Sequence, residues 1–171
     1  MRPVFLIGFM ATGKTTVGRL LASRTGRAFV DLDALVVEQA GHPIPAIFRE
    51  EGEEGFRRRE SAALAEAAAR TNVVVATGGG AACGETNLAL MRESGTVIWL
   101  KVSPAEVLRR TGGASGRPLL DGSDDPLARV TTLLAAREPF YARAHGSVDT
   151  DGVAPGFVAD RVLALVEGAS S

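Results

Sequence analysis

The sequence contains a phosphate-binding pattern close to its beginning, where residues 8–15 read Gly-Phe-Met-Ala-Thr-Gly-Lys-Thr. This run matches the P-loop pattern G-x-x-x-x-G-K-[ST], in which glycines let backbone N–H groups converge on phosphate oxygens. An apolar run at residues 4–7 precedes it and is typical of a buried parallel strand. Val17, Leu20 and Leu21 follow on one helical face. The sequence therefore predicts the strand, loop and helix that the motif requires.

Two side chains of this loop have defined chemistry in a nucleotide site. Lys14 can reach the β- and γ-phosphates, and the Thr15 hydroxyl can coordinate Mg²⁺. The start of the following helix adds partial positive charge at the same place. We therefore expect a bound nucleotide together with Mg²⁺. The loop residues expected to contact the nucleotide are Gly8, Ala11, Thr12, Gly13, Lys14, Thr15 and Thr16.

Length and composition limit the class of protein. A chain of 171 residues suits one domain, which we expect to span residues 1–171. The net charge of −1 does not suggest a nucleic-acid or membrane-surface partner, and no apolar stretch is long enough to span a membrane. The first strand begins too early to leave room for a secretory signal, and the single cysteine, Cys83, fits a reducing compartment. We therefore expect a cytoplasmic protein.

Further strands and helices alternate along the chain. Strands separated by helices after a P-loop predict an α/β fold, a P-loop kinase-like doubly wound parallel sheet of about five strands flanked by helices, with a lid loop. In such sheets ligands bind beyond the carboxyl ends of the strands. The strands predicted after the first lie at residues 28–30, 72–77, 96–100 and 147–150.

Two carboxylates follow the second predicted strand. Asp31 could belong to the Mg²⁺ coordination shell, and Asp33 could accept a hydrogen bond from a substrate hydroxyl. Alternatively, Asp33 is the N-cap of a helix that begins at Ala34. Both interpretations stay open on these residues alone.

Two glycine-bearing loops indicate contact with a ligand. Gly78, Gly79 and Gly80 follow a continuous β-branched run, and three glycines cost chain entropy unless a ligand presses against bare backbone. Residues 111–125 contain four more glycines and Arg117, which suits a lid that closes over a phosphoryl group. Plain surface disorder is the alternative for this second loop.

Together these motifs resemble the shikimate kinase family, small P-loop phosphotransferases, over nearly the whole chain. The resemblance implies ATP-dependent phosphorylation of the 3-hydroxyl of shikimate in aromatic amino acid biosynthesis by a cytoplasmic monomer, with ATP and shikimate as its partners. The motifs that carry it are the P-loop, Asp31-x-Asp33, Phe56-Arg57-x-x-Glu60, Gly78-Gly79-Gly80, Arg117-Pro118-Leu119 and Arg137-x-x-x-Tyr141.

The resemblance also implies roles for individual residues. Residues 33–61 would form a substrate-binding helical insert, and Arg110 would lie beside adenine. Lys14, Asp33 and Arg117 would be catalytic, with Arg117 in the lid against the transferred phosphate. Asp33 would either accept the proton of the attacking hydroxyl or orient it. The residues implied to hold shikimate are Asp33, Arg57, Gly78, Gly79, Gly80 and Arg137.

Shikimate, the acceptor that the resemblance implies, fits these side chains chemically. Shikimate carries one carboxylate and a row of hydroxyls, and the planar guanidinium groups of Arg57 and Arg137 match a carboxylate bidentately. One departure from the family lies in the P-loop, where Ala11 stands in place of a frequent glycine. If the backbone there needs a positive φ, alanine costs about 1 kcal/mol.

Two other functions fit parts of these motifs. Gluconate kinase also binds a carboxylate and hydroxyls, but the glycine triplet and the Arg117-Pro118-Leu119 sequence favour shikimate. A nucleotide-dependent switch is the alternative outside the enzymes, because Asp149-x-x-Gly152 superficially fits a switch motif. No Asn-Lys-x-Asp segment follows that motif, so the kinase interpretation is preferred.

Overall fold

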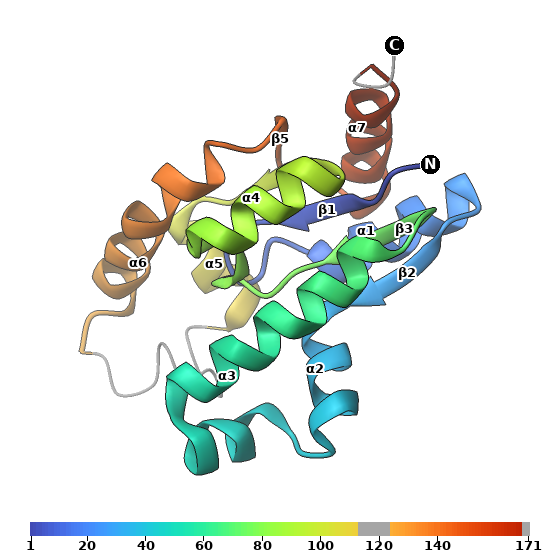
Figure 1. The fold of residues 1–171 in the computed structure, drawn as a ribbon. Coiled ribbons are helices and arrows are strands. Elements are labelled where there is room, and N and C mark those ends of the chain that lie inside the picture. The colour runs from blue at the N-terminus through green and yellow to red at the C-terminus, as the bar shows by residue number, and fades with distance from the viewer. Residues whose placement is uncertain (113–123, 169–171) are drawn as a thin grey trace.

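A five-stranded parallel sheet forms the centre of the protein in a computed structural model that describes residues 1–112 and 124–168 (Figure 1). The strand order is β2-β3-β1-β4-β5, and every neighbouring pair is parallel. This architecture confirms the predicted α/β fold with about five strands. The strands are β1 (Val4–Ile7), β2 (Ala28–Asp31), β3 (Val73–Ala76), β4 (Thr96–Lys101) and β5 (Gly146–Asp149).

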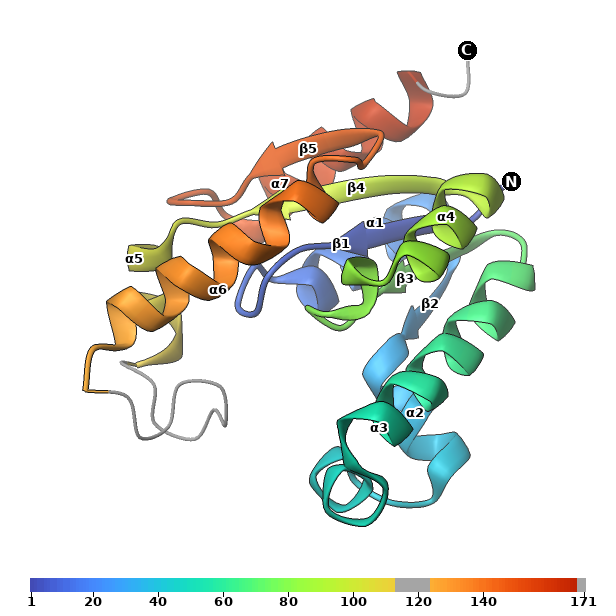
Figure 2. The same ribbon diagram turned by 60° about the vertical axis from the view of Figure 1, so that its left-hand side comes forward.

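Helices cover both faces of the sheet. Helices α1 and α7 pack on one face, while α3, α4 and α6 pack on the other (Figures 1 and 2). Within the described residues, no helix is both long and apolar enough to cross a membrane. The helices are α1 (Lys14–Thr25), α2 (Leu32–Ala40), α3 (Ile44–Ala69), α4 (Glu85–Ser94), α5 (Pro104–Thr111), α6 (Pro126–Tyr141) and α7 (Pro155–Gly168), with a 3-10 turn, η1, at Ala81–Cys83.

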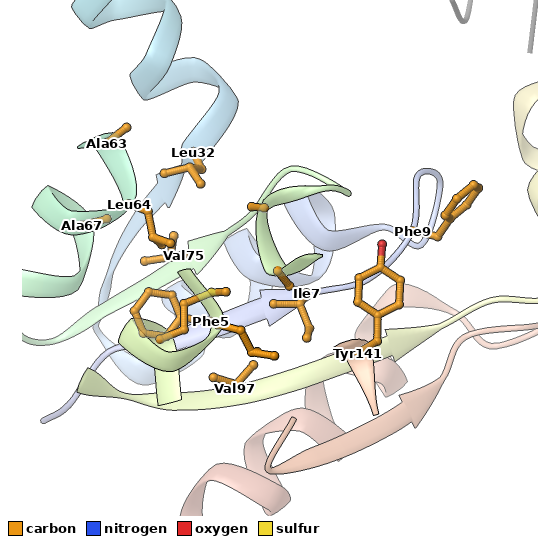
Figure 3. Close-up of a cluster of buried hydrophobic side chains, with 14 of the residues drawn as sticks. Phe5, Ile7, Phe9, Leu32, Ala63, Leu64, Ala67, Val75, Val97 and Tyr141 are labelled. Atoms are coloured by element: carbon orange, nitrogen blue, oxygen red, sulfur yellow. The ribbon is translucent and has the colours of Figure 1, made fainter. Parts of the chain in front are cut away.

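The central strand β1 supplies both hydrophobic cores because side chains alternate between the faces of a sheet. Phe5 and Ile7 belong to the cluster beneath α3, α4 and α6, part of which is drawn in Figure 3. Val4 and Leu6 belong to the cluster beneath α1 and α7. All four side chains are buried. The unbroken apolar run therefore fits a strand that is covered on both faces.

The strand register brings several predicted site residues to one edge of the sheet. Asp31 pairs with Ala76, and Leu6 pairs with the same Ala76 from the other side of β3. The P-loop after β1, the carboxylates after β2 and the glycines after β3 therefore emerge at nearly the same level. This edge is the carboxyl end of the strands, where doubly wound sheets bind ligands.

The charged helix α3 contains a kink. The helix begins at Ile44, with Pro45 in its first turn, where a missing N–H costs little. Gly52 has φ 70° and ψ −177° and interrupts the helix. Acidic and basic residues run across this kink, and in the sequence only Gly52 marks its position.

The helical pair α2–α3 covers the range of the predicted substrate-binding insert, residues 33–61, and the two helices pack against each other. Their role in binding substrate stays a prediction. The predicted lid at residues 111–125, with Arg117, lies almost entirely outside the described residues.

Candidate active site

The P-loop has a backbone conformation that requires glycine at its first position. Gly8 has φ +142°, and a Cβ there would lie 2.4 Å from the backbone oxygen of Leu100. Gly13 has φ +84° and is the residue from which α1 begins. Lys14 folds back over the loop, with its Nζ 2.8 Å from the Gly8 oxygen and 2.6 Å from the Phe9 oxygen. The side chain thereby holds the loop in its curled form.

Ala11 adopts a left-handed conformation in this loop, with φ +60°. The backbone at Ala11 therefore has the positive φ that strains a residue with a Cβ, at a cost of about 1–2 kcal/mol. Arg110 of α5 donates a hydrogen bond to the Ala11 carbonyl at 2.9 Å and another to the Thr150 carbonyl at 2.7 Å. Arg110 thus ties the strained residue to the end of β5.

A cavity of about 440 Å³ opens beside the loop and Arg110. Its volume lies in the range of small-molecule sites. The segment from Thr150 to Val158, after β5, forms much of the opposite wall. The predicted nucleotide-binding residues on the wall of this cavity are Ala11, Thr12, Gly13, Thr16 and Arg110.

Asp31 connects the end of β2 to the P-loop. Its Oδ2 accepts a hydrogen bond from the Thr15 hydroxyl at 2.8 Å. Its Oδ1 accepts from the backbone N–H groups of Asp33 and Ala34, so Asp31 is the N-cap of α2. The interpretation of Asp33 as the N-cap is therefore wrong, because the helix follows β2 without a loop and begins at Leu32.

Asp33 lies in the first turn of α2 and faces the glycine loop. A Cβ on Gly78 would lie 2.9 Å from Asp33 Oδ1 and 3.0 Å from Glu60 Oε2, so two carboxylates approach bare backbone here. Burial raises the pKa of the Asp33 carboxyl and nearby Asp31 raises it further, while Lys14 and Arg57 lower it. The net result is a raised pKa, and the two cations limit the rise.

Arg57 forms a partly buried ion pair on the inner face of α3. Its Nη1 lies 2.7 Å from Oε1 of Glu60, whose side chain is 1% exposed. Burial raises the pKa of the Glu60 carboxyl, and Arg57 opposes this rise. A Cβ on Gly80 would lie 2.6 Å from the Arg57 guanidinium, so that glycine admits the arginine. Arg58 and Arg59 instead pair with Glu54 and Glu51, so the three consecutive arginines point in different directions.

Arg137 approaches the same loop from α6. Its guanidinium carbon lies 5.4 Å from the centre of the Phe9 ring, and its Nη1 would be 3.1 Å from a Cβ on Gly79. A second cavity, of about 470 Å³, is lined by both guanidinium groups, Arg57 and Arg137, and by Gly80. Two fork-shaped cations from separate helices therefore face one cavity.

The structure gathers most of the predicted residues at one sheet edge. Gly79 lies between the glycine loop and the P-loop, since a Cβ there would lie 3.7 Å from both the Gly8 oxygen and the Met10 nitrogen of the P-loop. Arg117 lies outside the described residues, so its position stays a prediction. Sequence reasoning assigned no role to Glu60 or Tyr141, although their spacing from Arg57 and Arg137, three and four residues, places each pair on one helical face.

Comparisons with known proteins agree on one family. The sequence model of the family described as "Shikimate kinase" matches residues 10–167. The chain belongs to the shikimate kinase family. A shikimate kinase of Symbiobacterium thermophilum is 52% identical over 151 residues, which cover 86% of each chain. A shikimate kinase of Moorella thermoacetica is 46% identical and covers 87% of this chain and 85% of its own.

Solved structures support the same family. Shikimate kinase from Acinetobacter baumannii in complex with shikimate has a TM-score of 0.92 at 38% identity, covering 99% of this chain and 94% of that one. The Aquifex aeolicus shikimate kinase has a TM-score of 0.87 at 33% identity and covers 98% of each chain. A Sinorhizobium meliloti gluconokinase, at 20% identity and a TM-score of 0.66, shares the fold. The shikimate kinase resemblance is therefore confirmed and favoured over the gluconate kinase alternative.

Proposed function

We propose that this chain transfers the γ-phosphate of ATP to the 3-hydroxyl of shikimate, giving shikimate 3-phosphate and ADP in aromatic amino acid biosynthesis. The observation that carries the proposal is the meeting of Asp33, Arg57 and Arg137 around the glycine loop, beside Lys14, in a member of the shikimate kinase family. An acceptor bound there would lie next to a P-loop.

The two arginines would bind the carboxylate of shikimate. Arg57 and Arg137 line the same cavity, and a guanidinium group donates two parallel hydrogen bonds to a carboxylate. Glu60 would hold Arg57 in place, since the two side chains are 2.7 Å apart. Gly78, Gly79 and Gly80 would let the ring of the acceptor approach the backbone closely.

Asp33 would act on the hydroxyl that attacks the phosphate. An ionised carboxylate can accept the hydrogen bond of this hydroxyl, and so orient it or take its proton. Burial and Asp31 raise the pKa of Asp33, while Lys14 and Arg57 oppose the rise and so help to keep part of the population ionised. Positioning and charge neutralisation account for most of the catalysis in phosphoryl transfer, so the placement of Asp33 beside the P-loop is what the reaction needs.

The nucleotide would lie along the P-loop, with adenine in the cavity beside Arg110. Lys14 would contact the β- and γ-phosphates. Thr15 and Asp31 offer hydroxyl and carboxylate oxygens 2.8 Å apart, a donor set that fits Mg²⁺. When bound, Mg²⁺ would neutralise charge on the phosphate oxygens. On its motif, Arg117 would contact the transferred group from the lid.

An ADP-release assay tests the proposal. With Mg-ATP and the purified protein, shikimate should stimulate ADP formation at least a hundredfold over gluconate or no acceptor. Equal stimulation by gluconate, or none by shikimate, would refute it. We further infer a cytoplasmic monomer; the single cysteine fits a reducing compartment. Light scattering tests the monomer.

A further inference from the structure

Tyr141 is the last residue of α6, and its side chain is fully buried although it carries a polar hydroxyl. This hydroxyl donates a hydrogen bond to the carbonyl oxygen of Gly79 at 2.5 Å, and the ring packs against Trp99 with centroids 5.8 Å apart. Figure 3 shows Tyr141 beyond the carboxyl end of β1, close to Ile7. A buried tyrosine needs a partner for its hydroxyl, and here the partner belongs to the loop that borders the proposed acceptor site.

Arg137 and Tyr141 approach the same glycine from one helical turn. They are four residues apart on α6, so their side chains lie on one face of the helix. The Tyr141 hydroxyl bonds the Gly79 carbonyl, while Arg137 Nη1 would be 3.1 Å from a Cβ on Gly79. The Arg137 guanidinium also lies close enough to oppose the rise that burial causes in the pKa of the Tyr141 hydroxyl. The position of the arginine and the orientation of the glycine are thus coupled.

The hydrogen bond to Gly79 also orients the next N–H group. In a planar trans peptide the C=O and N–H bonds point in opposite directions, so the N–H of Gly80 points away from Tyr141. Gly80 lines the cavity that Arg57 and Arg137 share. Glycine has wide conformational freedom, and without the tyrosine hydroxyl this peptide would have more orientations available.

We propose that Tyr141 is a positioning residue for the acceptor, whose hydroxyl fixes the Gly79–Gly80 peptide and the Arg137 side chain so that the acceptor carboxylate meets a preformed site. The inference rests on the proposed function, because the acceptor in question is shikimate. Burial raises the pKa of the Tyr141 hydroxyl, so it stays protonated and remains a donor at working pH.

The substitution Tyr141→Phe tests this role because it removes the hydroxyl and keeps the ring against Trp99. One lost hydrogen bond should raise the KM for shikimate three- to tenfold. The Kd for shikimate from calorimetry should rise by the same factor. The KM for ATP should stay within twofold of wild type, because the hydroxyl does not contact the P-loop cavity.

Two control variants separate positioning from general stability. Ser94→Ala removes a side-chain bond to the Leu90 carbonyl, 2.7 Å long and at the far end of α4, and should change neither KM. Trp99→Phe disturbs the packing of the Tyr141 ring and keeps the bond to Gly79, so the KM for shikimate should stay within twofold. Thermal denaturation of each variant checks that it is folded.

A double-mutant cycle tests the coupling to Arg137. If both side chains act on one preformed site, Tyr141→Phe combined with Arg137→Lys should raise the KM for shikimate by less than the product of the single effects. A KM for shikimate within twofold of wild type in Tyr141→Phe, or a parallel rise in the KM for ATP, would overturn the inference. Absence of shikimate-dependent ADP formation by the wild type would instead refute the proposed function.

Discussion

The Thr15 hydroxyl donates a hydrogen bond to the Asp31 carboxylate, with 2.8 Å between the two oxygens. This contact joins the start of α1 to the end of β2 and spans 16 residues of the chain. The same carboxylate caps α2 through its other oxygen. Asp31 therefore caps a helix and, under the proposed function, also binds Mg²⁺. The substitution Asp31→Asn separates these two roles.

Asp31→Asn should weaken Mg²⁺ binding without unfolding α2. Asparagine caps helices as well as aspartate does, so the cap is kept while the negative charge is lost. The Mg²⁺ concentration for half-maximal activity should rise at least threefold, as measured by titrating Mg²⁺ at constant ATP. Asp160→Asn, in an exposed pair with Arg24, is the matched control. An unchanged Mg²⁺ dependence would argue against Asp31 as a metal ligand.

Arg57→Ala should raise the KM for shikimate at least tenfold and leave the KM for ATP nearly unchanged, because it removes one of two carboxylate partners. Arg58→Ala is the control, since Arg58 pairs with Glu54 on the exposed side of the same helix. Steady-state kinetics with each substrate varied in turn measure the effect. A larger change in the KM for ATP would show that Arg57 has been misassigned.

The same substitution should also lower stability, because Glu60 is buried and loses its partner. Burial raises the pKa of Glu60, so the carboxyl can take up a proton and the loss of Tm should shrink as pH falls. The double variant Arg57→Ala/Glu60→Gln should recover Tm but not the KM for shikimate. Recovery of both would mean that Arg57 acts only through folding.

Asp33→Asn should lower kcat at least a hundredfold and yet raise the Tm of the ligand-free protein at pH 7. The pKa of Asp33 is raised by burial, so the folded state binds its proton more tightly than the unfolded state does. Ionising Asp33 therefore costs stability as pH rises from the ordinary carboxyl pKa through the raised one. The gain in Tm should shrink as the pH is lowered from 7 toward 4. A fall in Tm at pH 7 would contradict the conclusion that ionised Asp33 destabilises the folded protein.

The local signals of the sequence predicted the sheet and most of the site. Apolar runs such as residues 4–7 marked the strands, because a strand that is covered on both faces of a sheet is apolar along its whole length. The sequence did not predict the positive φ of Ala11; it indicated only that such a φ would be strained. Its conformation depends on how the whole loop curls, and the hydrogen bond that Arg110 donates to it spans 99 residues.

Contacts between distant segments explain what the sequence could not predict. The role of Tyr141 depends on the Gly79 carbonyl, 62 residues away, and no spacing within α6 reveals that partner. The sequence left open whether Asp33 is the N-cap of a helix or a functional residue. Asp31 offers the same capping chemistry, and only the exact end of β2 shows that Asp31 is the cap. The kink at Gly52 was missed because charges of both signs run across it.

Ala11→Gly should stabilise the protein or leave its stability unchanged, although most glycine substitutions destabilise. Ala11 has φ +60°, and relief of this conformation is worth about 1–2 kcal/mol, against about 0.5–1 kcal/mol of added chain entropy in the unfolded state. The net gain is therefore between zero and about 1.5 kcal/mol, and each kcal/mol corresponds to a rise in Tm of about 2–4 °C for a protein of this size.

Ala65→Gly is the matched control for this substitution, because Ala65 is exposed in α3. Glycine in a helix interior costs about 1 kcal/mol, so this variant should lower Tm by a similar amount. The KM for ATP of Ala11→Gly should not rise, since the loop already has the conformation that glycine favours. A fall in Tm of Ala11→Gly as large as that of Ala65→Gly would mean that Ala11 is not strained, and that its bond to Arg110 holds a relaxed loop.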